Sequence, residues 1–467
     1  MNGGRRVLVA LAAGATLAAA PAGAAPAGEL GCLAIRGETV LESAAAERRK
    51  TPASVQKLAV TAAALHTLGP DFHVTTRVLA AGPVTSGPQG TRRLRGDLVL
   101  EAAGDPTWSD DFFDGGAAEP LGALARAVRD AGIDAVDGDL VVDLSRFPGR
   151  PAPPSRSIGD LAFGFGAPTG GVAVDANTTS LTMAPGAAVG EPPRFTADGV
   201  EVVNRARTVD ADRRDRGTVD FQATWDDGRL VIRGEYPISE PSYRITVAVA
   251  DGERRAARAF RRALAALGVE VTGDIELSRR AVAGRPVASL ASPPLAEWLP
   301  PILGDSDNWL ADMLLRVLAA EHTGAGRLGD GVRWLDAFLT DEVGLHDDAV
   351  HLDDASGLSP HNLWTPRAVV DLLAWAERQP WRTVYRGALA RTGGGTLKAW
   401  PGLPSTLGAK TGTLTHTLGL AGYLETPGQP VIFACLLNHD TAPRPRQRRM
   451  LTDKVWRWHK LTSEGSL

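Results

Sequence analysis

The sequence predicts an α/β (α+β) protein in which an antiparallel sheet, covered by helices, is interrupted by a large β-rich insertion. Three observations lead to this fold class. Strand-like runs occur near the start of the chain and again near its end. Long amphipathic helical patterns occupy the last third. Between these parts, short β-rich runs alternate with turns rich in glycine and proline.

The bulk composition describes an ordinary globular protein. The chain has 467 residues, of which 44% are hydrophobic, and this is enough for more than one core. Its formal net charge is -4, and 22% of its residues are charged. The arginines are spread among a similar number of carboxylates, which argues against a nucleic-acid binder.

Residues 1–28 are expected to be a secretory signal that lies outside the fold. Arg5 and Arg6 give a positive start, "VLVALAAGATLAAA" is the apolar segment, and Ala22-Gly23-Ala24 supplies small residues for cleavage. The apolar run is too short for a membrane span, and no later stretch is long and apolar enough to be one. We therefore expect an exported protein.

The first elements of the mature chain are two strands and a helix. Residues 30–41 suggest a strand, a glycine turn and a second strand. A helix should then start with Thr51 as its N-cap and Pro52 at its first position, and Gly69 follows its end.

From about residue 78 to residue 288 the pattern changes to short strands, and this region is expected to be an insertion of two nested domains. Two passages in it are alike, "LARAVRDAGIDAVDGDLVVD" and the one from Ala259 to Leu277. Each gives a helix, a glycine turn, Gly-Asp and a strand, which indicates related α/β units.

Residues 29–77 and 289–467 are expected to form one discontinuous domain. Helical patterns return after Pro293, and two late strands, "LGLAGYLE" and "PVIFACLLN", should complete the sheet begun near Leu30. The final helical pattern, "RMLTDKVWRWHKL", should cover one face of that sheet.

Two cysteines, Cys32 and Cys435, lie in strand-like runs near the two ends of the mature chain. They are either two buried thiols or, in an exported protein, one disulfide, and the sequence leaves both states open.

The stretch "TPASVQKLAV" places Ser54 three residues before Lys57 at the helix entrance, so the two side chains share a face. In the first helical turn the backbone N–H groups lack partners and the helix dipole is positive. A serine there is suited to attack a carbonyl group. A desolvated lysine beside it is suited to act as a base, because burial favours the neutral amine.

Two further motifs follow in order. Ser306-Asp307-Asn308 precedes a helical pattern, and Lys410-Thr411-Gly412 begins a strand-like one. Together with S-x-x-K, these motifs form the signature of class A β-lactamases and penicillin-binding proteins. Three motifs in the right order, with two of the chain's few lysines in the required places, argue against coincidence.

The chain resembles the D-alanyl-D-alanine carboxypeptidases of the class C penicillin-binding protein group, peptidase family S13. The long insertion between Ser54 and Ser306 marks this family. The passages "ALHTLGPDFHVTTRV", "GDLVLEAAGDPTW", "LDDASGLSPHNLWTP" and "GGGTLKAW" also resemble it. The resemblance covers nearly the whole mature chain and implies a β-lactamase/transpeptidase-like domain.

The resemblance also implies the catalytic roles. Ser54 would attack the penultimate D-alanine carbonyl and become acylated, and Lys57 would accept its proton. Ser306 and Lys410 would relay a proton to the leaving amine. Asn308 would hold the substrate amide and orient Lys57.

Substrate binding would fall to the strand of the third motif. Thr411, with the lysine before it, would bind the terminal carboxylate. The N–H groups of Ser54 and Thr413 would form the oxyanion hole. Gly412 would leave room for substrate along the strand.

Two positions concern the substrate's diaminopimelate side chain. The family's Asp-Gly-Ser-Gly-Leu-Ser segment is here Asp354–Ser359, with Ala355 in place of the first glycine. The arginine that often follows it in relatives is replaced by Pro360, so we expect this protein to recognise that side chain differently or not at all. Asp143 resembles an acidic position of the insertion that could hold an amino group.

No cofactor and no metal are expected. The run "HDDAVHLDD" from His346 lacks ligands paired on a defined element. The expected partners are peptidoglycan stem peptides and β-lactams, with no nucleic acid and at most peripheral membrane contact, in a periplasmic or extracellular cell-wall compartment. The sequence does not give the oligomeric state.

The function expected is a serine D-Ala-D-Ala carboxypeptidase that also acts as an endopeptidase on some cross-links. Two alternatives stay open at this point. One is a β-lactamase or esterase of the same fold. The other is a non-catalytic cell-wall binding protein that uses the insertion for contacts.

Overall fold

The computed structural model describes residues 28–87, 90–210, 220–400 and 402–463 of the chain. Residues 1–27 of the expected signal segment therefore lie outside the described residues. Within the described ranges, no helix combines the length and the apolar character needed to cross a bilayer.

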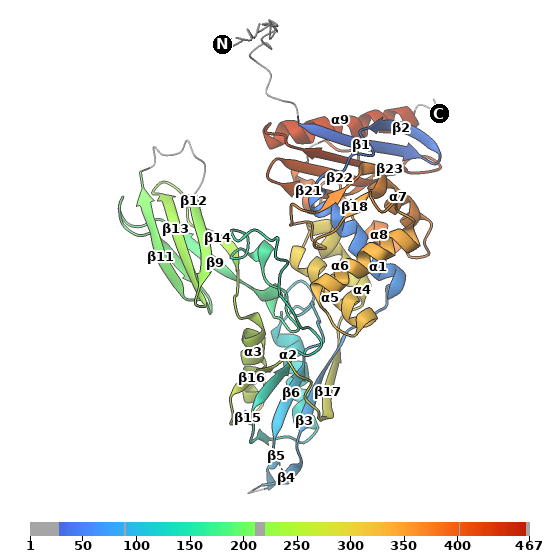
Figure 1. Ribbon diagram of the computed structural model, residues 1–467. Coiled ribbons are helices and arrows are strands. Elements are labelled where there is room, and N and C mark those ends of the chain that lie inside the picture. The colour runs from blue at the N-terminus through green and yellow to red at the C-terminus, as the bar shows by residue number, and fades with distance from the viewer. Residues whose placement is uncertain (1–27, 88–89, 211–219, 401, 464–467) are drawn as a thin grey trace, which may run out of the picture.

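A six-stranded antiparallel sheet joins the two ends of the described chain (Figure 1). Its order is β2-β1-β23-β22-β21-β20. These strands are β1 (Glu29–Arg36), β2 (Thr39–Ala44), β20 (Ala390–Arg391), β21 (Leu407–Leu414), β22 (Thr417–Leu424) and β23 (Val431–Asn438). The first and last strands pair along their whole length. The fold class expected from the sequence, an antiparallel sheet covered by helices, is confirmed.

Cys32 lies directly opposite Cys435 in the pairing of β1 with β23. The two Cα atoms are 4.1 Å apart, and the side chains form a disulfide. Of the two states that the sequence left open, the structure has the bonded one.

Helices cover both faces of this sheet, which explains why β22 and β23 are buried at every position. On one face, α9 (Arg444–Ser463) packs Leu451, Val455 and Trp458 against the strands, as the sequence led us to expect. The opposite face packs against the remaining helices of this part of the molecule and a two-stranded ribbon, β18 (Val350–His351) and β19 (Leu363–Trp364). These helices are η1 (Ala53–Gln56), α1 (Lys57–Thr67), α4 (Leu295–Pro300), η6 (Pro301–Asp305), α5 (Asn308–Thr323), α6 (Leu328–Phe338), η7 (Leu339–Val343), α7 (Pro366–Glu377) and α8 (Arg382–Gly387). The short helix η8 (Gly395–Ala399) instead places Leu397 in the cluster that contains α9.

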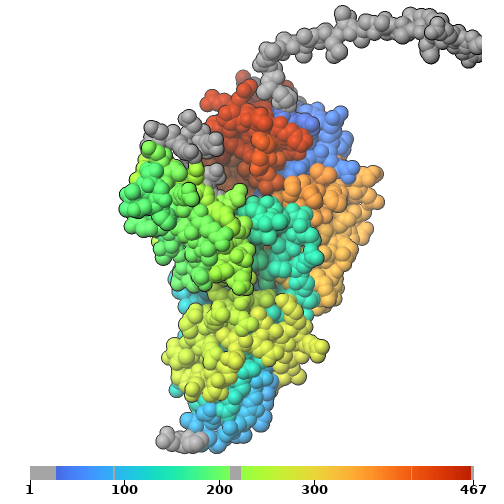
Figure 2. Space-filling model, turned by 60° about the vertical axis from the view of Figure 1, so that its left-hand side comes forward, coloured from blue at the N-terminus to red at the C-terminus, as the bar shows by residue number. Residues whose placement is uncertain are grey.

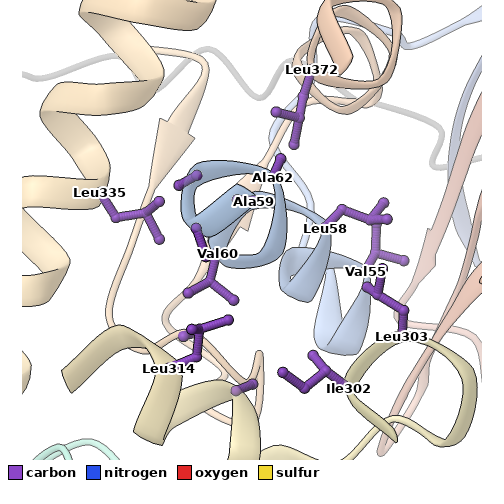
Figure 3. Packing of buried hydrophobic residues seen from close by; sticks show 14 of the residues in the cluster. Val55, Leu58, Ala59, Val60, Ala62, Ile302, Leu303, Leu314, Leu335 and Leu372 are labelled. Atoms are coloured by element: carbon purple, nitrogen blue, oxygen red, sulfur yellow. The ribbon is translucent and has the colours of Figure 1, made fainter. Parts of the chain in front are cut away.

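Helix α1 lies at the centre of the largest hydrophobic cluster and is buried from Lys57 to Leu65 (Figure 3). The α-helix starts later than the sequence suggested, because the residues before it, Ala53–Gln56, form a 3₁₀ turn. The backbone of Ala53 has φ 48°, which a continuous α-helix starting at Pro52 cannot accommodate.

The middle of the chain forms four further sheets (Figure 1). One has the order β16-β8-β6-β3-β17 and contains β3 (Thr75–Ala81), β6 (Asp97–Glu101), β8 (Leu140–Asp143), β16 (Ile275–Ser278) and β17 (Arg285–Ala291). Another has the order β15-β7-β5-β4 and contains β4 (Val84–Ser86), β5 (Arg92–Leu94), β7 (Ala135–Val136) and β15 (Glu270–Val271). Two three-stranded sheets, β10-β9-β14 and β11-β13-β12, are built from β9 (Thr178–Ala184), β10 (Arg194–Ala197), β11 (Val202–Val209), β12 (Asp220–Asp226), β13 (Arg229–Pro237) and β14 (Tyr243–Ala248).

The likeness of two passages in the sequence has a structural counterpart. Helix α2 (Ala118–Asp130) leads through β7 into β8, and α3 (Gly252–Ala266) leads through β15 into β16. The corresponding strands lie side by side in parallel, β15 on β7 and β16 on β8. Gly132 and Gly268 turn the chain after each helix with the same φ of 78°.

The segment between β8 and β9 (residues 144–177) is the part of the insertion that contacts helix α5 of the main domain. Two 3₁₀ turns lie in it, η3 (Gly164–Gly166) and η4 (Asp175–Asn177). The guanidinium group of Arg316 in α5 donates to the carbonyl oxygen of Phe147 at 2.9 Å. In Figure 2 the teal residues of the insertion lie directly against orange residues of the last third of the chain.

We expect Leu314→Ala to lower the free energy of unfolding by about 2–5 kcal/mol, because it opens a cavity where α5 packs on α1. Leu314 is fully buried and lies next to Val60 in Figure 3. Denaturant titration of purified variants measures this change. Ile158→Ala is the control, since 76% of Ile158 is exposed and the expected change is within about 0.5 kcal/mol. Equal effects of the two substitutions would contradict the packing described here.

Candidate active site

Ser54 and Lys57 meet at the entrance of α1, as their spacing predicted. Ser54 is half-buried in the 3₁₀ turn, and Lys57 is the first residue of the α-helix. The amine Nζ of Lys57 donates a hydrogen bond to the hydroxyl Oγ of Ser54 at 2.9 Å. The backbone of Ala53, directly before the serine, is held in the left-handed region, where a non-glycine residue is strained.

The amine of Lys57 has two further acceptors, and both come from distant parts of the chain. It donates to Oδ1 of Asn308 at 2.6 Å and to the carbonyl oxygen of Ser356 at 2.5 Å. An ammonium group has three N–H donors, so these two bonds and the bond to Ser54 use all of them. The position of the amine is therefore fixed from three directions.

Burial determines the charge of Lys57. The side chain is fully buried, and this desolvation lowers its pKa to about 8. The negative charges of Asp312, Asp354 and Asp307 oppose this change, whereas the positive charge of Arg156 adds to it. The neutral form of the lysine is thus a minor fraction at pH 7 and about half of the population near pH 8.

The second motif lies at the junction of η6 and α5. Ser306 follows the π-helical turn with φ 72°, a left-handed conformation that ends the turn and lets α5 begin. Asp307 caps α5 and accepts a hydrogen bond from the N–H of Leu310 at 2.8 Å. Asn308 points its amide oxygen at Lys57 and donates from Nδ2 to the carbonyl oxygen of Phe165 in the insertion at 2.9 Å.

The third motif lies on β21, which passes directly beside the turn that holds Ser54. Lys410 is fully buried and donates to the carbonyl oxygen of Thr411 at 3.0 Å. Burial, and then the positive charge of Lys57, hold the pKa of Lys410 well below its usual range. The two lysines are therefore close enough to repel each other.

Gly412 is required by packing against this turn. A Cβ atom there would lie 2.4 Å from the carbonyl oxygen of Pro52 and 3.2 Å from the side chains of Ala53 and Val55. The sequence suggested that Gly412 leaves space for substrate, whereas the neighbour in the structure is the chain on either side of Ser54. The strand can approach the serine this closely only because Gly412 has no side chain.

The other neighbour of β21, β20, pairs with it only at Gly408 and Ala409. Beyond that point, from Lys410 to Leu414, the described strands pair with β21 on its β22 side alone. Thr411 is nearly buried and Thr413 is exposed on this edge. The carbonyl oxygen of Thr411 accepts the Lys410 amine, and no described strand pairs with this stretch of the edge, so an extended chain could pair beside it.

A fourth segment, Asp354–Ser359, completes the surroundings of Lys57, a contact that the sequence did not predict. The Asp354 carboxylate accepts from the N–H groups of Gly357 at 2.8 Å and Ser359 at 2.9 Å and folds the segment into a loop. This loop carries the Ser356 carbonyl that accepts from Lys57. Gly357 has φ 76°, and a Cβ atom there would lie 2.0 Å from the carbonyl oxygen of Ala53.

One expected site residue, Asp143, is not brought into this group. Both carboxylate oxygens of Asp143 accept backbone N–H groups, from Ser145 at 2.9 Å and from Val282 at 2.8 Å, and so hold the end of β8. Its sheet lies at the bottom of the view in Figure 1, away from β21. Pro360 is exposed, and in the described ranges no group of three His, Cys, Asp or Glu residues is placed to hold a metal ion.

Two charged residues beside Lys57 were missed. Asp312 lies in the buried part of α5, and the one signal for it was a carboxylate within the apolar text "NWLADMLLR". Arg156 reaches the site from the insertion, and no motif in the sequence around it predicts that position. A cavity of about 790 Å³ borders Ser306 and Asn308 and is otherwise lined largely by the insertion, including Ser109 and Phe165.

A model of the D-Ala-D-Ala carboxypeptidase 3 (S13) family matches residues 23–456. The chain belongs to this family. A D-alanyl-D-alanine carboxypeptidase of Actinomadura sp. (strain R39) is 30% identical over 442 residues, which cover 88% of this chain and 79% of the relative. The D-alanyl-D-alanine carboxypeptidase DacB of Haemophilus influenzae is 26% identical over 404 residues, 83% of this chain and 80% of the relative. The S13 chain is thus an enzyme of the D-Ala-D-Ala carboxypeptidase class.

Solved structures show the same fold as this S13 chain. Penicillin binding protein 4 (dacB) of H. influenzae superposes with a TM-score of 0.82 at 22% identity, over 94% of this chain and 97% of that chain. The same protein in complex with a β-lactam gives a TM-score of 0.77. The mixed architecture with a transpeptidase-like domain and inserted sheets is therefore shared.

We expect Gly357→Ala to slow release of D-alanine from a D-Ala-D-Ala peptide by about a hundredfold, because the new Cβ would displace the backbone before Ser54. Gly344→Ala is the matched control, since Gly344 also has a left-handed φ of 81° but has no neighbouring atom within 4 Å of the added Cβ. Both variants carry the same type of backbone strain, and only the first touches the turn that holds Ser54. Equal losses of activity would show that the contact with Ala53 is unimportant.

Proposed function

We propose that this protein is a serine D-Ala-D-Ala carboxypeptidase that cleaves peptidoglycan stem peptides through an acyl-enzyme on Ser54. One observation carries the proposal. The buried amine of Lys57 lies 2.9 Å from Ser54 Oγ, while Asn308 and Ser356 hold the same amine from the other sides. A serine and a lysine held in this way form a nucleophile with its base.

Neutral Lys57 has two N–H donors and one lone pair. The acceptors on Asn308 and Ser356 take the two N–H groups, so the lone pair is left facing Ser54. The serine O–H then donates to this lone pair. As Oγ bonds to the carbonyl carbon of the penultimate D-alanine, its proton passes to Lys57, and the burial of the amine supports this role.

The developing oxyanion would accept hydrogen bonds from the N–H groups of Ser54 and Thr413. The approach of β21 to the serine's turn, which Gly412 permits, supports this assignment. Collapse of the tetrahedral intermediate breaks the C–N bond, and Ser306 with Lys410 delivers a proton to the leaving amine. Water then cleaves the ester and regenerates Ser54.

The terminal carboxylate of the substrate would bind Lys410 and Thr411. Burial favours the neutral form of Lys410 in the free enzyme, and a bound carboxylate would favour its ammonium form. The peptide would lie extended along the free edge of β21 and add to the sheet. Such pairing would recognise the backbone of the peptide, whereas the protein side chains around the edge would determine which peptide side chains are accepted.

Two finer properties extend the proposal. The cavity of about 790 Å³ beside Ser306 has room for more than a terminal residue, which favours some endopeptidase action on cross-linked peptides. The cyclic amide of a β-lactam would acylate the same serine. Rapid turnover of penicillin without release of D-alanine would instead favour a β-lactamase, and a folded chain that takes no label would favour a non-catalytic binding protein.

We place the protein outside the cytoplasm, in the periplasmic or extracellular cell-wall compartment. The basic and apolar start of the sequence supports export, and the Cys32–Cys435 disulfide fits an oxidising compartment. We also propose that residues 29–77 and 289–467 form the penicillin-binding domain and that residues 78–288 form an insertion of two nested domains.

We expect Ser54→Ala to abolish the adduct with a labelled penicillin and to lower D-alanine release by about a thousandfold or more, because the attacking oxygen is gone. Mass spectrometry of tryptic peptides locates the adduct in the unaltered protein. Ser289→Ala is the control, because Ser289 is exposed on β17, in the sheet that lies away from β21, and has no role in the proposed chemistry. An adduct on another residue, with normal activity in Ser54→Ala, would refute the mechanism.

We expect the acylation rate constant to rise with pH through about 8, because Lys57 must lose its proton before it can accept one from Ser54. Burial lowers the pKa of this amine, so the active neutral form is present above that pH and is lost below it. Stopped-flow measurement with a chromogenic β-lactam gives this profile. A rate constant that does not change across this range would rule out a titrating base.

A further inference from the structure

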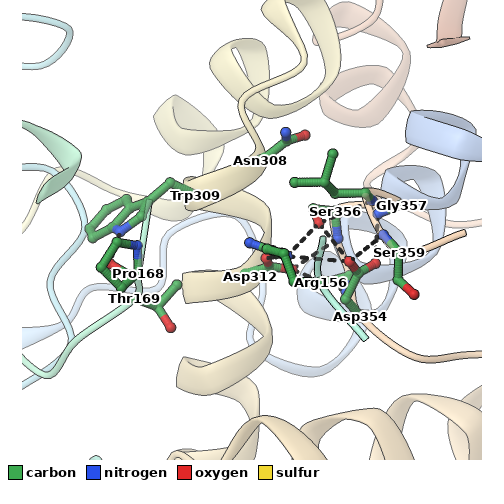
Figure 4. Close-up of polar contacts among 12 residues, drawn as sticks. Arg156, Pro168, Thr169, Asn308, Trp309, Asp312, Asp354, Ser356, Gly357 and Ser359 are labelled. Atoms are coloured by element: carbon green, nitrogen blue, oxygen red, sulfur yellow. Dashed lines mark hydrogen bonds and ion pairs between the residues drawn. The ribbon is translucent and has the colours of Figure 1, made fainter. Parts of the chain in front are cut away.

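Arg156 carries a charge from the insertion into the buried surroundings of Lys57 (Figure 4). Its side chain is 2% exposed. The guanidinium Nη2 lies 2.6 Å from Asp312 Oδ2 and 3.3 Å from Asp354 Oδ2, and it donates to the Ser356 hydroxyl at 3.2 Å. One arginine thus joins helix α5 to the loop that follows β18.

Both carboxylates position the backbone that holds Lys57. The other oxygen of Asp312, Oδ1, accepts from the N–H groups of Ala355 at 3.1 Å and Ser356 at 3.0 Å. Asp354 accepts from the Ser356 hydroxyl at 3.0 Å as well as from the backbone of its own loop. The carbonyl of Ser356 then accepts from Lys57. The chain of contacts from Arg156 to the amine of Lys57 therefore passes through Ser356.

The same group sets the electrostatic balance at Lys57. The charged side chains that face its amine come from α5 and its cap, from the loop after β18, from the insertion and from β21: Asp307, Asp312, Asp354, Arg156 and Lys410. Asp312 and Asp354 favour the ammonium form of Lys57, and Arg156 opposes them. Two buried carboxylates facing Lys57 without the guanidinium would favour the charged form of the lysine, which is the wrong form for a base.

We propose that Arg156 is a positioning residue of the active site, which ties the Asp312–Asp354 pair and the Ser356 carbonyl together and offsets their negative charge beside Lys57. This inference rests on the proposed role of Lys57 as the base. It gives the insertion a function in catalysis itself. The bond from Asn308 Nδ2 to the Phe165 carbonyl, on the same inserted segment, supports this function, because Asn308 is the second acceptor of Lys57.

The experiment compares the pH dependence of acylation by a labelled penicillin in the full chain and its variants. The acid limb of this profile is the pH range in which the acylation rate constant rises as Lys57 loses its proton. In Arg156→Met we expect the acid limb to move to higher pH by about one unit or more. At a fixed pH below the limb this shift corresponds to acylation about tenfold slower. Arg156→Lys, which keeps the charge, should shift the limb less.

Charge compensation separates this role from a merely structural one. Arg156→Met/Asp312→Asn removes one charge of each sign, so its acid limb should return towards that of the unaltered protein. Asp312→Asn alone should move the limb to lower pH. If Arg156→Met does not fold, Asp312→Asn and Arg156→Lys still test the inference, and an unmoved limb in Asp312→Asn would overturn it.

Arg146→Met is the matched control, because Arg146 is a second arginine of the inserted segment that forms an ion pair with α5, through Glu321 at 2.5 Å, on the exposed surface. Its acid limb should stay in place. If the unaltered protein takes no label at Ser54, the proposed function itself fails. If it is labelled and Arg156→Met keeps an unchanged acid limb, only the role of Arg156 is wrong.

Discussion

The burial of one amine is the constraint on which this structure depends. A buried lysine needs a hydrogen-bond acceptor for each N–H group and nearby charges that balance its own. Without them, its burial would destabilise the folded state by several kcal/mol. Lys57 obtains its acceptors from three separate segments, which carry Ser54, Asn308 and Ser356. Helix α1 packs against α5, and the turn η1 before it packs against β21, so the start of α1 lies where these segments meet.

The backbone around the serine is held in conformations that an isolated chain would avoid. Ala53 and Ser306, neither of them glycine, both have positive φ, and each such residue costs about 1–3 kcal/mol. Gly412 and Gly357 allow a strand and a loop to press on the same turn from two sides. Close packing on both sides keeps the strained turn in place and fixes the direction in which Ser54 points.

The sequence predicted the groups that react better than the groups that support them. Lys57, Asn308 and the strand of Lys410 meet around Ser54 and its turn, as the three motifs predicted. The 3₁₀ turn before α1 was missed, because it depends on contacts of Ala53 with distant segments. Arg156 and Asp312 could not be paired from the sequence, since charges 156 positions apart meet only in the folded chain. Asp143 was assigned from its resemblance to a family position, and the backbone N–H groups of Ser145 and Val282 occupy its carboxylate in the structure.

The pairing of the first strand with the last has a consequence for how the molecule is made. Cys32 and Cys435 are 403 positions apart, so the main sheet cannot close until the ribosome has delivered nearly the whole chain. The inserted sheets pair mostly over shorter separations and can form while synthesis continues. Because β21 and Ser356 also arrive late, the incomplete chain has Ser54 but lacks part of the surroundings of Lys57. Under the mechanism proposed above, a nascent molecule would therefore stay inactive until its C-terminal strands are in place.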